Sequence, residues 1–329
     1  MSQHNTKKLD CVGIGLSPYD FALQVPKHPQ SNSKNVALQY QNQGGGPVPN
    51  ALAVLAQLEC RTALVTTMGD DIYAERVLNE LKSYNIDVRG FRRDGEVESL
   101  QSHIIVEAES GRRTVVLNTN KIPEIRTGQV PEKMLGNTKF VHLDSRPSPA
   151  IIELVRQAKD HGALVMLDAG SVQEYTDELL PLVDYPILSN RFVKDYYGHS
   201  NVERACREIC EFGATIAGIT MGAEGSYLSN DSEMIYIPAF EVDAVDTTGA
   251  GDLYHGGLLF GILHDWSLKA AGQFASAVAA IGCQHFGARS YLPDIETIKD
   301  FLLEHGITKH PVLLEQMDIF SDANSTPAA

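Results

Sequence analysis

Apolar strand-like runs alternate with amphipathic helix-like runs through the second half of the chain, and this alternation restricts the fold more than any other feature. Four short apolar runs predict strands, and each of the first three is followed by a segment with helical spacing. The predicted strands are 139–144, 163–170, 185–190 and 215–220, and the predicted helices are 149–161, 176–183 and 202–212. Such alternation is typical of a parallel sheet covered by helices on both faces. We therefore expect an α/β fold with a doubly wound, mainly parallel sheet flanked by helices.

The first half of the chain carries a second kind of sheet signal. Buried strands are predicted at 9–16 and 61–68, followed by a helix at 72–84. From about Phe91 to Asn118, two strand-like runs instead flank Ser110-Gly111-Arg112, which predicts a hairpin in a small sheet that projects from the main one. The expected organisation is a single domain at 1–310, inserted segments at about 17–42 and 91–120, and a poorly ordered tail at 311–329.

The composition disfavours several classes of function. The formal net charge of −15 argues against a nucleic-acid or anionic-membrane surface, because both depend on basic patches. No stretch approaches the ~20 apolar residues of a membrane span, and the N-terminal residues lack the apolar core of a signal peptide. The five cysteines are scattered without a CxxC pair, which favours reduced thiols. We expect a cytoplasmic protein with no nucleic-acid or membrane partner.

The stretch 246–252, DTTGAGD, follows a strand-like run at 241–245 and opens an apolar helical segment at 253–263. Its two glycines leave the backbone free to approach a bulky anion, and the unpaired amides of the first helical turn then point at that anion. Asp252 either accepts a proton from an attacking hydroxyl or simply caps the helix. The helix start is expected to keep Asp252 ionised at neutral pH and to make it only a modest base. We interpret His255 as a packed helix residue rather than a proton carrier.

A resemblance to a known family favours the catalytic alternative. DTTGAGD, followed by small residues in the helix at 253–259, resembles the C-terminal signature of the ribokinase-like, or PfkB, carbohydrate kinases. The resemblance implies a ribokinase-like fold in which the small β-sheet is a lid over the sugar. It also implies that Asp252 is the catalytic base and that the amides of Gly249, Ala250 and Gly251 form an anion hole. Asp246 is a candidate ligand for a monovalent cation such as K⁺.

Sugar-binding residues are implied by the family's N-terminal signature. Gly45, Gly46 and Asn50 match its two glycines and its asparagine, and Asp20 matches a sugar-binding aspartate just after the first strand. A solvated loop carboxylate remains the alternative for Asp20. The usual small residues of this signature are replaced at three positions, which leaves the sugar undefined: Val48, Leu52 and Glu59.

Two arginines are further candidates for substrate binding. Arg113 lies beside the predicted hairpin, and it reaches a substrate if the hairpin belongs to the lid; otherwise it is a solvated turn residue. Arg146 follows a predicted strand close to Asp144. It either pairs with that carboxylate or faces a sugar hydroxyl or phosphate. Both alternatives stay open for each arginine.

The nucleotide side of the site is also implied by the resemblance. Asn190 matches the asparagine of the family's Asn-x-x-Glu motif, whose glutamate helps to place magnesium through water, but Val193 occupies the glutamate position. Mg²⁺ is then held mainly by ATP phosphates and water, or catalysis is weakened. Four more residues match a nucleotide-contacting T-x-G-x-x-G motif and a loop that closes over adenine: Thr220, Gly222, Gly225 and Gly287.

These features together predict an ATP-dependent kinase that uses Mg²⁺ and acts on a hydroxyl of a small sugar or sugar derivative. A nucleoside kinase of the same fold and a non-catalytic sugar- or nucleotide-binding member stay open as alternatives. The expected partners are the sugar and ATP, with a homodimer through the lid as a further open alternative.

Overall fold

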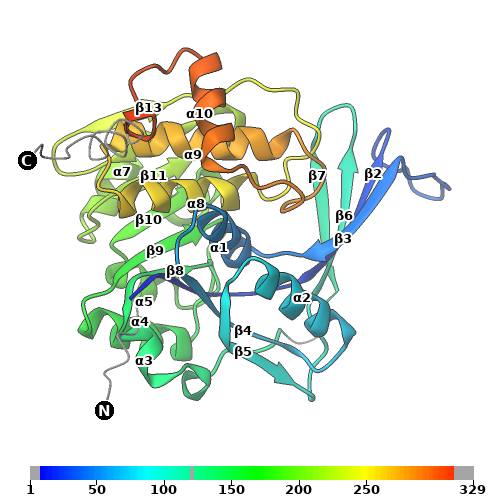
Figure 1. Cartoon of the computed structure of the whole chain (residues 1–329), viewed down its shortest axis with the longest axis horizontal. Coiled ribbons are helices and arrows are strands. Elements are labelled where there is room, and N and C mark those ends of the chain that lie inside the picture. Colours follow the sequence, from blue (N-terminus) through cyan, green and yellow to red (C-terminus); the bar gives the residue numbers. More distant parts are fainter. Residues whose placement is uncertain (1–7, 119–121, 315–329) are drawn as a thin grey trace, which may run out of the picture.

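The computed structural model describes residues 8–118 and 122–314, whose main sheet has nine strands in the order β13-β12-β11-β10-β9-β8-β1-β4-β5 (Figure 1). The strands from β11 to β5 are mutually parallel, and β12 and β13 extend the sheet in antiparallel fashion. The strands are β1 (Leu9–Ile14), β4 (Thr62–Gly69), β5 (Asp87–Asp94), β8 (Thr138–Leu143), β9 (Leu164–Ala169), β10 (Tyr185–Ser189), β11 (Ala217–Thr220), β12 (Ser226–Ser229) and β13 (Met234–Ile237). The predicted doubly wound, mainly parallel sheet is confirmed.

The strand order reverses direction at β1, which pairs with β4 on one side and with β8 on the other. Chain connections therefore leave this point toward opposite halves of the sheet. In open α/β sheets, the loops at the carboxyl ends of such strands separate and leave a crevice where ligands bind. This topology puts a candidate ligand site beyond the ends of β1, β8 and β9.

Two helical layers cover the sheet, each over its own apolar core (Figure 1). One layer contains α1 (Pro47–Gln57), α2 (Ile72–Ser83), α8 (Ala250–Leu263), α9 (Leu268–Cys283), α10 (Ile295–Glu304) and α11 (Pro311–Leu314). The other contains α3 (Glu132–Leu135), α4 (Pro149–Asp160), α5 (Thr176–Leu179), α6 (Asn190–Tyr197) and α7 (Val202–Cys210).

Helix α8 is apolar around most of its circumference because it lies between α1 and α9. A Cβ atom on Gly256 would lie 2.8 Å from the carbonyl oxygen of Ala51 in α1, and one on Gly257 would lie 2.9 Å from the Cα atom of Ala275 in α9. Glycine at both positions therefore allows the three helices to pack closely. This packing holds the start of α8 rigidly at the ligand edge.

A separate four-stranded sheet, in the order β3-β2-β6-β7, projects beside the main body (Figure 1). Its strands are β2 (Tyr19–Val25), β3 (Gln39–Gly44), β6 (Gln101–Glu107) and β7 (Arg113–Asn118). The predicted hairpin around Gly111 joins β6 and β7, but β2 and β6 pair in parallel. The second inserted segment contributes from Gln101 onward rather than from about residue 91, because β5 pairs with β4 in the main sheet.

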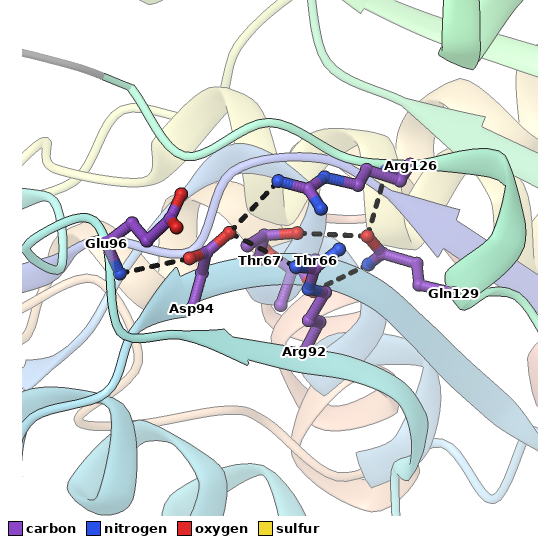
Figure 2. A network of polar contacts seen from close by, with 7 residues as sticks. All are labelled: Thr66, Thr67, Arg92, Asp94, Glu96, Arg126 and Gln129. Carbon is purple, nitrogen blue, oxygen red and sulfur yellow. Dashed lines mark hydrogen bonds and ion pairs between the residues drawn. The ribbon is translucent and has the colours of Figure 1, made fainter.

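A polar network fastens the segment after β7 to the edge of the main sheet (Figure 2). Asp94 at the end of β5 pairs with Arg92 at 3.3 Å and with Arg126 at 3.4 Å. The side chain of Gln129 accepts a hydrogen bond from the Thr67 hydroxyl at 3.0 Å and donates to the carbonyl of Thr66 at 2.9 Å. The chain that leaves the small sheet is thus bound to β4 and β5.

Other sequence expectations need correction. The run 241–245 is not a strand, since it follows the surface without a ladder partner, and the expected tail begins with a short helix, α11, in which Val312 is buried. Residues 315–329 of that tail lie outside the described residues. Helices α6 and α10 were not predicted. Across the part of the chain that the structure describes, no helix is both long and apolar enough to span a bilayer. All five cysteines are free thiols.

Candidate active site

The start of α8 has the open geometry that an anion would need. Gly249 adopts a left-handed conformation with φ of 79°, and the helix has no side-chain cap. A Cβ atom on Gly249 would lie 2.8 Å from that of Ala288, whereas one on Gly251 would meet nothing within 4 Å. The amide of Ala250 makes a long hydrogen bond of 3.3 Å to the carbonyl of Thr247. The space above the first turn is therefore open, and among the described residues a bound anion would compete with one weak bond at these amides.

Asp252 lies in this first turn with a partly buried side chain. Its carboxylate accepts a hydrogen bond of 2.6 Å from the side-chain amide of Asn50 in α1. Burial and the negative charge of Asp168 raise the pKa of Asp252 to about 6, against the opposing effects of Asn50, His255 and Arg113. The carboxylate is thus mostly ionised at neutral pH, as expected, but the expectation of a modest base is wrong, because burial and the Asp168 charge make it a stronger base than a solvated aspartate.

Asp20, in β2, has a nearly inaccessible side chain rather than a solvated one, with 4% of its surface exposed. Burial raises its pKa to about 7, opposed by a hydrogen bond from Ser102 and the charge of Arg289, and the charge of Asp252 adds to the rise. A Cβ atom on Gly45 would overlap the Asp20 carboxylate. Glycine is therefore required where the loop before α1 crosses Asp20.

Gly46 completes this loop and caps α1 from a positive φ of 100°. A Cβ atom at Gly46 would clash with the carbonyl oxygen of Leu16, so the loop can pass the end of β1 only without a side chain. The four residues proposed to bind the sugar, Asp20, Gly45, Gly46 and Asn50, therefore meet around the carboxyl end of β1.

A buried ion pair behind this loop was missed at the sequence level. Arg289 has an inaccessible side chain, and its Nη2 atom lies 3.1 Å from Oε1 of Glu80 in α2. The other oxygen of Glu80 accepts a hydrogen bond of 2.6 Å from the amide of Gly44. The pair joins the loop after Gly287 to the end of β3. No local pattern marks it, because the two residues are far apart in the sequence.

The proposed nucleotide residues lie on neighbouring loops of the same edge. Asn190 opens α6 after β10, and Thr220 ends the adjacent strand β11. Gly222 and Gly225 have positive φ angles of 62° and 90° in the turn that joins β11 to β12. A glycine-rich hairpin turn is what these residues would predict without the family resemblance, and the structure forms such a turn. A Cβ atom on Gly225 would overlap the carbonyl oxygen of Ile237, so that hairpin needs glycine for its own structure.

Asp246 links the glycine turn to the loop that contains Gly287. Its carboxylate accepts hydrogen bonds from the amides of Thr248 at 2.8 Å and of Gly287 at 2.9 Å. Gly287 has a positive φ of 100°. The two loops proposed to hold the phosphates and the adenine are thus joined by one buried carboxylate.

The two arginine candidates lie in different surroundings. Arg113 in β7 donates a hydrogen bond of 3.3 Å to the hydroxyl of Thr247, so the small sheet touches the glycine turn. Arg146 lines a cavity of about 660 Å³ beyond the ends of β1 and β8, together with Asp144. Asp144 accepts hydrogen bonds from the amides of Leu16 and Arg146. Neither Asp252 nor Asn50 lines that cavity, so the cavity does not bring Arg146 together with Asp252.

Val193 cannot stand in for the glutamate of the Asn-x-x-Glu motif, because it is 1% exposed and packs in the core under α6. Within residues 8–118 and 122–314, no group of three or more His, Cys, Asp or Glu side chains is arranged to hold a metal ion. A magnesium ion at this edge would therefore depend on nucleotide phosphates and water for most of its ligands, which suits its reluctance to lose water.

Two further side chains lie beside Asp252. Asp168 is the penultimate residue of β9, and its Oδ2 atom lies 3.5 Å from Nδ1 of His255 in α8. A carboxylate at the carboxyl end of a predicted strand is the same signal that drew attention to Asp20. Applied to every strand, that signal finds Asp168 as well.

An open helix start next to a carboxylate of raised pKa, at the switch point of a doubly wound sheet, has the form that transfer of a phosphoryl group to a hydroxyl would need. The sequence profile of the pfkB family carbohydrate kinases matches residues 6–295. The chain belongs to this family and is a kinase with a ribokinase-like fold.

The chain is similar to several proteins named as kinases and to solved structures of kinases. It is 26% identical over 299 residues to the ATP-dependent ribose-1-phosphate kinase of Halopiger xanaduensis, covering 89% of this chain and 98% of the relative. It is 25% identical over 324 residues to the nucleoside kinase of Methanothermobacter thermautotrophicus, covering 90% of this chain and 97% of the relative. The crystal structure of a putative ribokinase II from E. coli in complex with ATP and Mg²⁺ superposes with a TM-score of 0.79 at 18% identity, over 90% of this chain and 100% of that one.

Proposed function

We propose that the protein transfers the γ-phosphoryl group of ATP to a hydroxyl of a small sugar or sugar derivative, with Asp252 as the base. The observation that carries this proposal is the hydrogen bond of 2.6 Å from Asn50 to Asp252, beside the open start of α8. This bond joins the proposed acceptor side and the proposed phosphate side in one site. The E. coli neighbour with bound ATP and Mg²⁺ supports the same nucleotide and ion here.

In the proposed reaction, the oxygen of the acceptor hydroxyl bonds to the γ-phosphorus of ATP, and Asp252 takes the proton of that hydroxyl. The bond between the γ-phosphorus and the oxygen that bridges it to the β-phosphate breaks, and ADP leaves with its electrons. The Asp252 pKa of about 6 leaves this carboxylate ionised at neutral pH and still able to accept that proton. The amides at 249–251 stabilise the charge on the transferring group. Magnesium, when bound with ATP, neutralises the triphosphate.

Asp20, Gly45, Gly46 and Asn50 are proposed to hold the acceptor. Asn190, Thr220, Gly222, Gly225 and Gly287 are proposed to hold the nucleotide. Arg113 is proposed to reach the substrate from β7, since it already contacts Thr247 at the glycine turn. Arg146 is retained as a contact for a larger acceptor that extends into the adjoining cavity. A monovalent cation such as K⁺ at Asp246 is a further proposal, supported by the burial of that carboxylate.

We treat residues 1–310 as one kinase domain in which the small sheet is a lid. The outer face of that sheet carries exposed apolar side chains, with Leu23 44% exposed, Tyr40 75% exposed and Val116 57% exposed. Leu23 and Tyr40 are cross-strand partners on this face. An exposed apolar sheet face of this kind supports a homodimer through the lid.

A nucleoside acceptor is the second candidate, because the Methanothermobacter relative is a nucleoside kinase. A non-catalytic binding member is the third, because Val193 replaces the motif's glutamate. ATP turnover against a panel of aldoses, ketoses, sugar acids and nucleosides distinguishes the three. Turnover on none of them, with intact ATP binding, would favour the non-catalytic alternative.

The decisive variant is Asp252→Asn. Asparagine keeps the size and can accept from the helix amides, but it cannot take a proton. We expect a loss in kcat of about 10²–10⁴-fold on the best acceptor, with ATP affinity and melting temperature nearly unchanged. Asp265→Asn, just beyond the other end of α8, is the matched control and should keep full activity. Wild-type kcat in Asp252→Asn would refute the proposed mechanism.

A further inference from the structure

The small sheet is docked on the main body through its inner face. Three of its side chains, Ala22 in β2 with Ile104 and Val106 in β6, are at most 3% exposed and form an apolar cluster with Phe286. Val245 packs against the same cluster. Phe286 comes just before the proposed adenine loop, and Val245 comes just before the glycine turn. The sheet therefore rests on both segments of chain that lead into the proposed nucleotide site.

Hydrogen bonds continue this contact into the glycine turn itself. The side-chain amide of Gln24 in β2 donates to the carbonyl of Val245 at 3.3 Å. At the tip of the β6–β7 hairpin, the carbonyl oxygen of Gly111 accepts two hydrogen bonds from Thr247, one from its amide at 3.1 Å and one from its hydroxyl at 2.9 Å. The same hydroxyl accepts a hydrogen bond of 3.3 Å from Arg113. The amide and the hydroxyl of Thr247 are thus both bonded to the hairpin.

The hairpin comes this close because residue 111 is a glycine. Gly111 has a φ of 63°, and a Cβ atom there would lie 2.9 Å from the carbonyl oxygen of Ala244. A side chain would therefore strain the hairpin backbone and push its tip away from residues 244–247.

The segment before α8 is anchored at two places, and the two anchors belong to different parts of the fold. The amides of Val245 and Asp246 donate to the carbonyl of Cys283 at the end of α9, at 2.8 Å and 3.1 Å. The carboxylate of Asp246 also accepts from the amide of Gly287. Within the described residues, the amide and hydroxyl of Thr247 instead bond only to the hairpin. The main body thus holds residues 245–246, and the small sheet holds the next residue.

Thr247 stands directly before the proposed anion hole. Its carbonyl oxygen is the acceptor of the 3.3 Å hydrogen bond from the Ala250 amide. A shift of Thr247 would therefore move the partner of an amide that is proposed to face the transferred charge. Hydrogen bonds weaken steeply as their alignment is lost, and donors stabilise a transition state best when they are held in place beforehand. The position of the hairpin is thus transmitted to the anion hole through one residue.

We propose that Thr247 is a positioning residue for the kinase reaction: the Gly111 carbonyl holds it, and this contact fixes the glycine turn so that the amides at 249–251 point at the transferring group. The same small sheet carries Asp20, which is proposed to bind the acceptor. One docked sheet would therefore align the acceptor and the anion hole together. In this role Thr247 touches neither the transferring group nor the acceptor, and the inference rests on the proposed function.

The first experiment compares Thr247→Val, which removes the hydroxyl and keeps the branched shape, with Thr247→Ser, which keeps the hydroxyl. On the acceptor of the panel with the highest turnover, kcat of Thr247→Val should fall by about tenfold, because a positioning contact is lost. The KM of the acceptor and the Kd of ATP should stay within about twofold of the wild type, and Thr247→Ser should restore kcat to within about twofold. Thr114→Val is the matched control, since Thr114 is an exposed residue on the outer face of the same hairpin, and it should keep the wild-type kcat.

Gly111→Ala tests the same contact from the hairpin side. It should also lower kcat by about tenfold, and Gly111→Ala/Thr247→Val should lose no more than about twofold beyond the more impaired single variant. Gly162→Ala is the matched control, because Gly162 has a positive φ of 82° but a Cβ atom there would meet nothing within 4 Å. It should keep the wild-type kcat. Losses that multiply in the double variant would overturn the proposed coupling.

Hydrogen exchange of the ligand-free protein gives a second readout that does not depend on turnover. If the hairpin and the turn hold each other, amides in both 107–112 and 246–251 should exchange faster than in the wild type, by about threefold or more, in Thr247→Val and in Gly111→Ala. Faster exchange confined to the segment that carries the substitution would contradict the coupling.

A wild-type kcat in Thr247→Val would overturn the proposal, and so would a Thr247→Ser enzyme as slow as the valine variant. If Thr247→Val does not fold, a wild-type kcat in Gly111→Ala has the same force. Failure of the proposed function is recognised separately, because Asp252→Asn would then retain turnover. If Asp252→Asn is inactive and Thr247→Val turns over like the wild type, the role of Thr247 alone is refuted.

Discussion

The buried carboxyl of Asp20 should make the free energy of unfolding of this kinase depend on pH. The substitution Asp20→Asn should remove this part of the pH dependence. The Asp20 side chain is 4% exposed, and burial raises its pKa from 3.8 to about 7. The folded protein therefore binds this proton more tightly than the unfolded chain does. The stabilisation is fully present below about pH 3.8 and is lost as the pH rises through about 7.

The size of the effect follows from these two values. At about 1.4 kcal/mol per unit, the full difference between 3.8 and 7 corresponds to about 4 kcal/mol of the free energy of unfolding. Between about pH 5 and about pH 8.5, the part that is lost is about 2–3 kcal/mol. Asp20→Asn has no such proton to lose. Its stability relative to the wild type should therefore increase by about 2–3 kcal/mol over that interval.

The measurement is urea unfolding of both proteins at the two pH values, without acceptor or nucleotide. The raised pKa of Asp144 is common to both proteins, so its contribution cancels in the comparison, whereas the interaction of Asp20 with Asp252 is part of the difference that is measured. Asp243→Asn, at an exposed loop carboxylate, is the control and should show no pH-dependent difference. A stability difference between Asp20→Asn and the wild type that stays constant with pH would refute the reasoning.

Two further substitutions test the backbone and core under the site. Gly249→Ala forces a side chain into the left-handed region and within 2.8 Å of the Ala288 Cβ atom, so thermal melting should reveal a loss of about 1–3 kcal/mol. Gly251→Ala, where a Cβ atom meets nothing within 4 Å, should melt close to the wild type, and equal losses would contradict the strain argument. Val193→Glu, at a site 1% exposed, should cost at least about 3 kcal/mol in urea unfolding and should not restore magnesium binding. Val193→Ala should cost less, and a stable Val193→Glu with a lower Mg²⁺ requirement would show that the side chain can reach the nucleotide.

Much of the fold could be predicted from the spacing of apolar residues along the sequence. Apolar runs such as 163–170 and the helix at 149–161 formed where predicted, because strand and helix periodicity are properties of consecutive residues. The conformational freedom expected of the two glycines in DTTGAGD is used at one of them, since Gly249 adopts a left-handed conformation. The strand predicted at 241–245 did not form, because a β-like composition does not make a strand without a neighbouring strand to pair with.

The sequence by itself therefore determined the class of fold, and its resemblance to the family marked the glycine turn and Asp252 as candidates for the anion hole and the base. Only the tertiary structure decided which groups meet that carboxylate. Asn50 lies 202 positions away in the chain, and Asp168 comes from another strand, yet both act on Asp252 across the switch point of the sheet. The acidities of Asp20 and Asp252 were likewise fixed by folding, because desolvation and charge depend on what surrounds a group in space, and local sequence does not encode that.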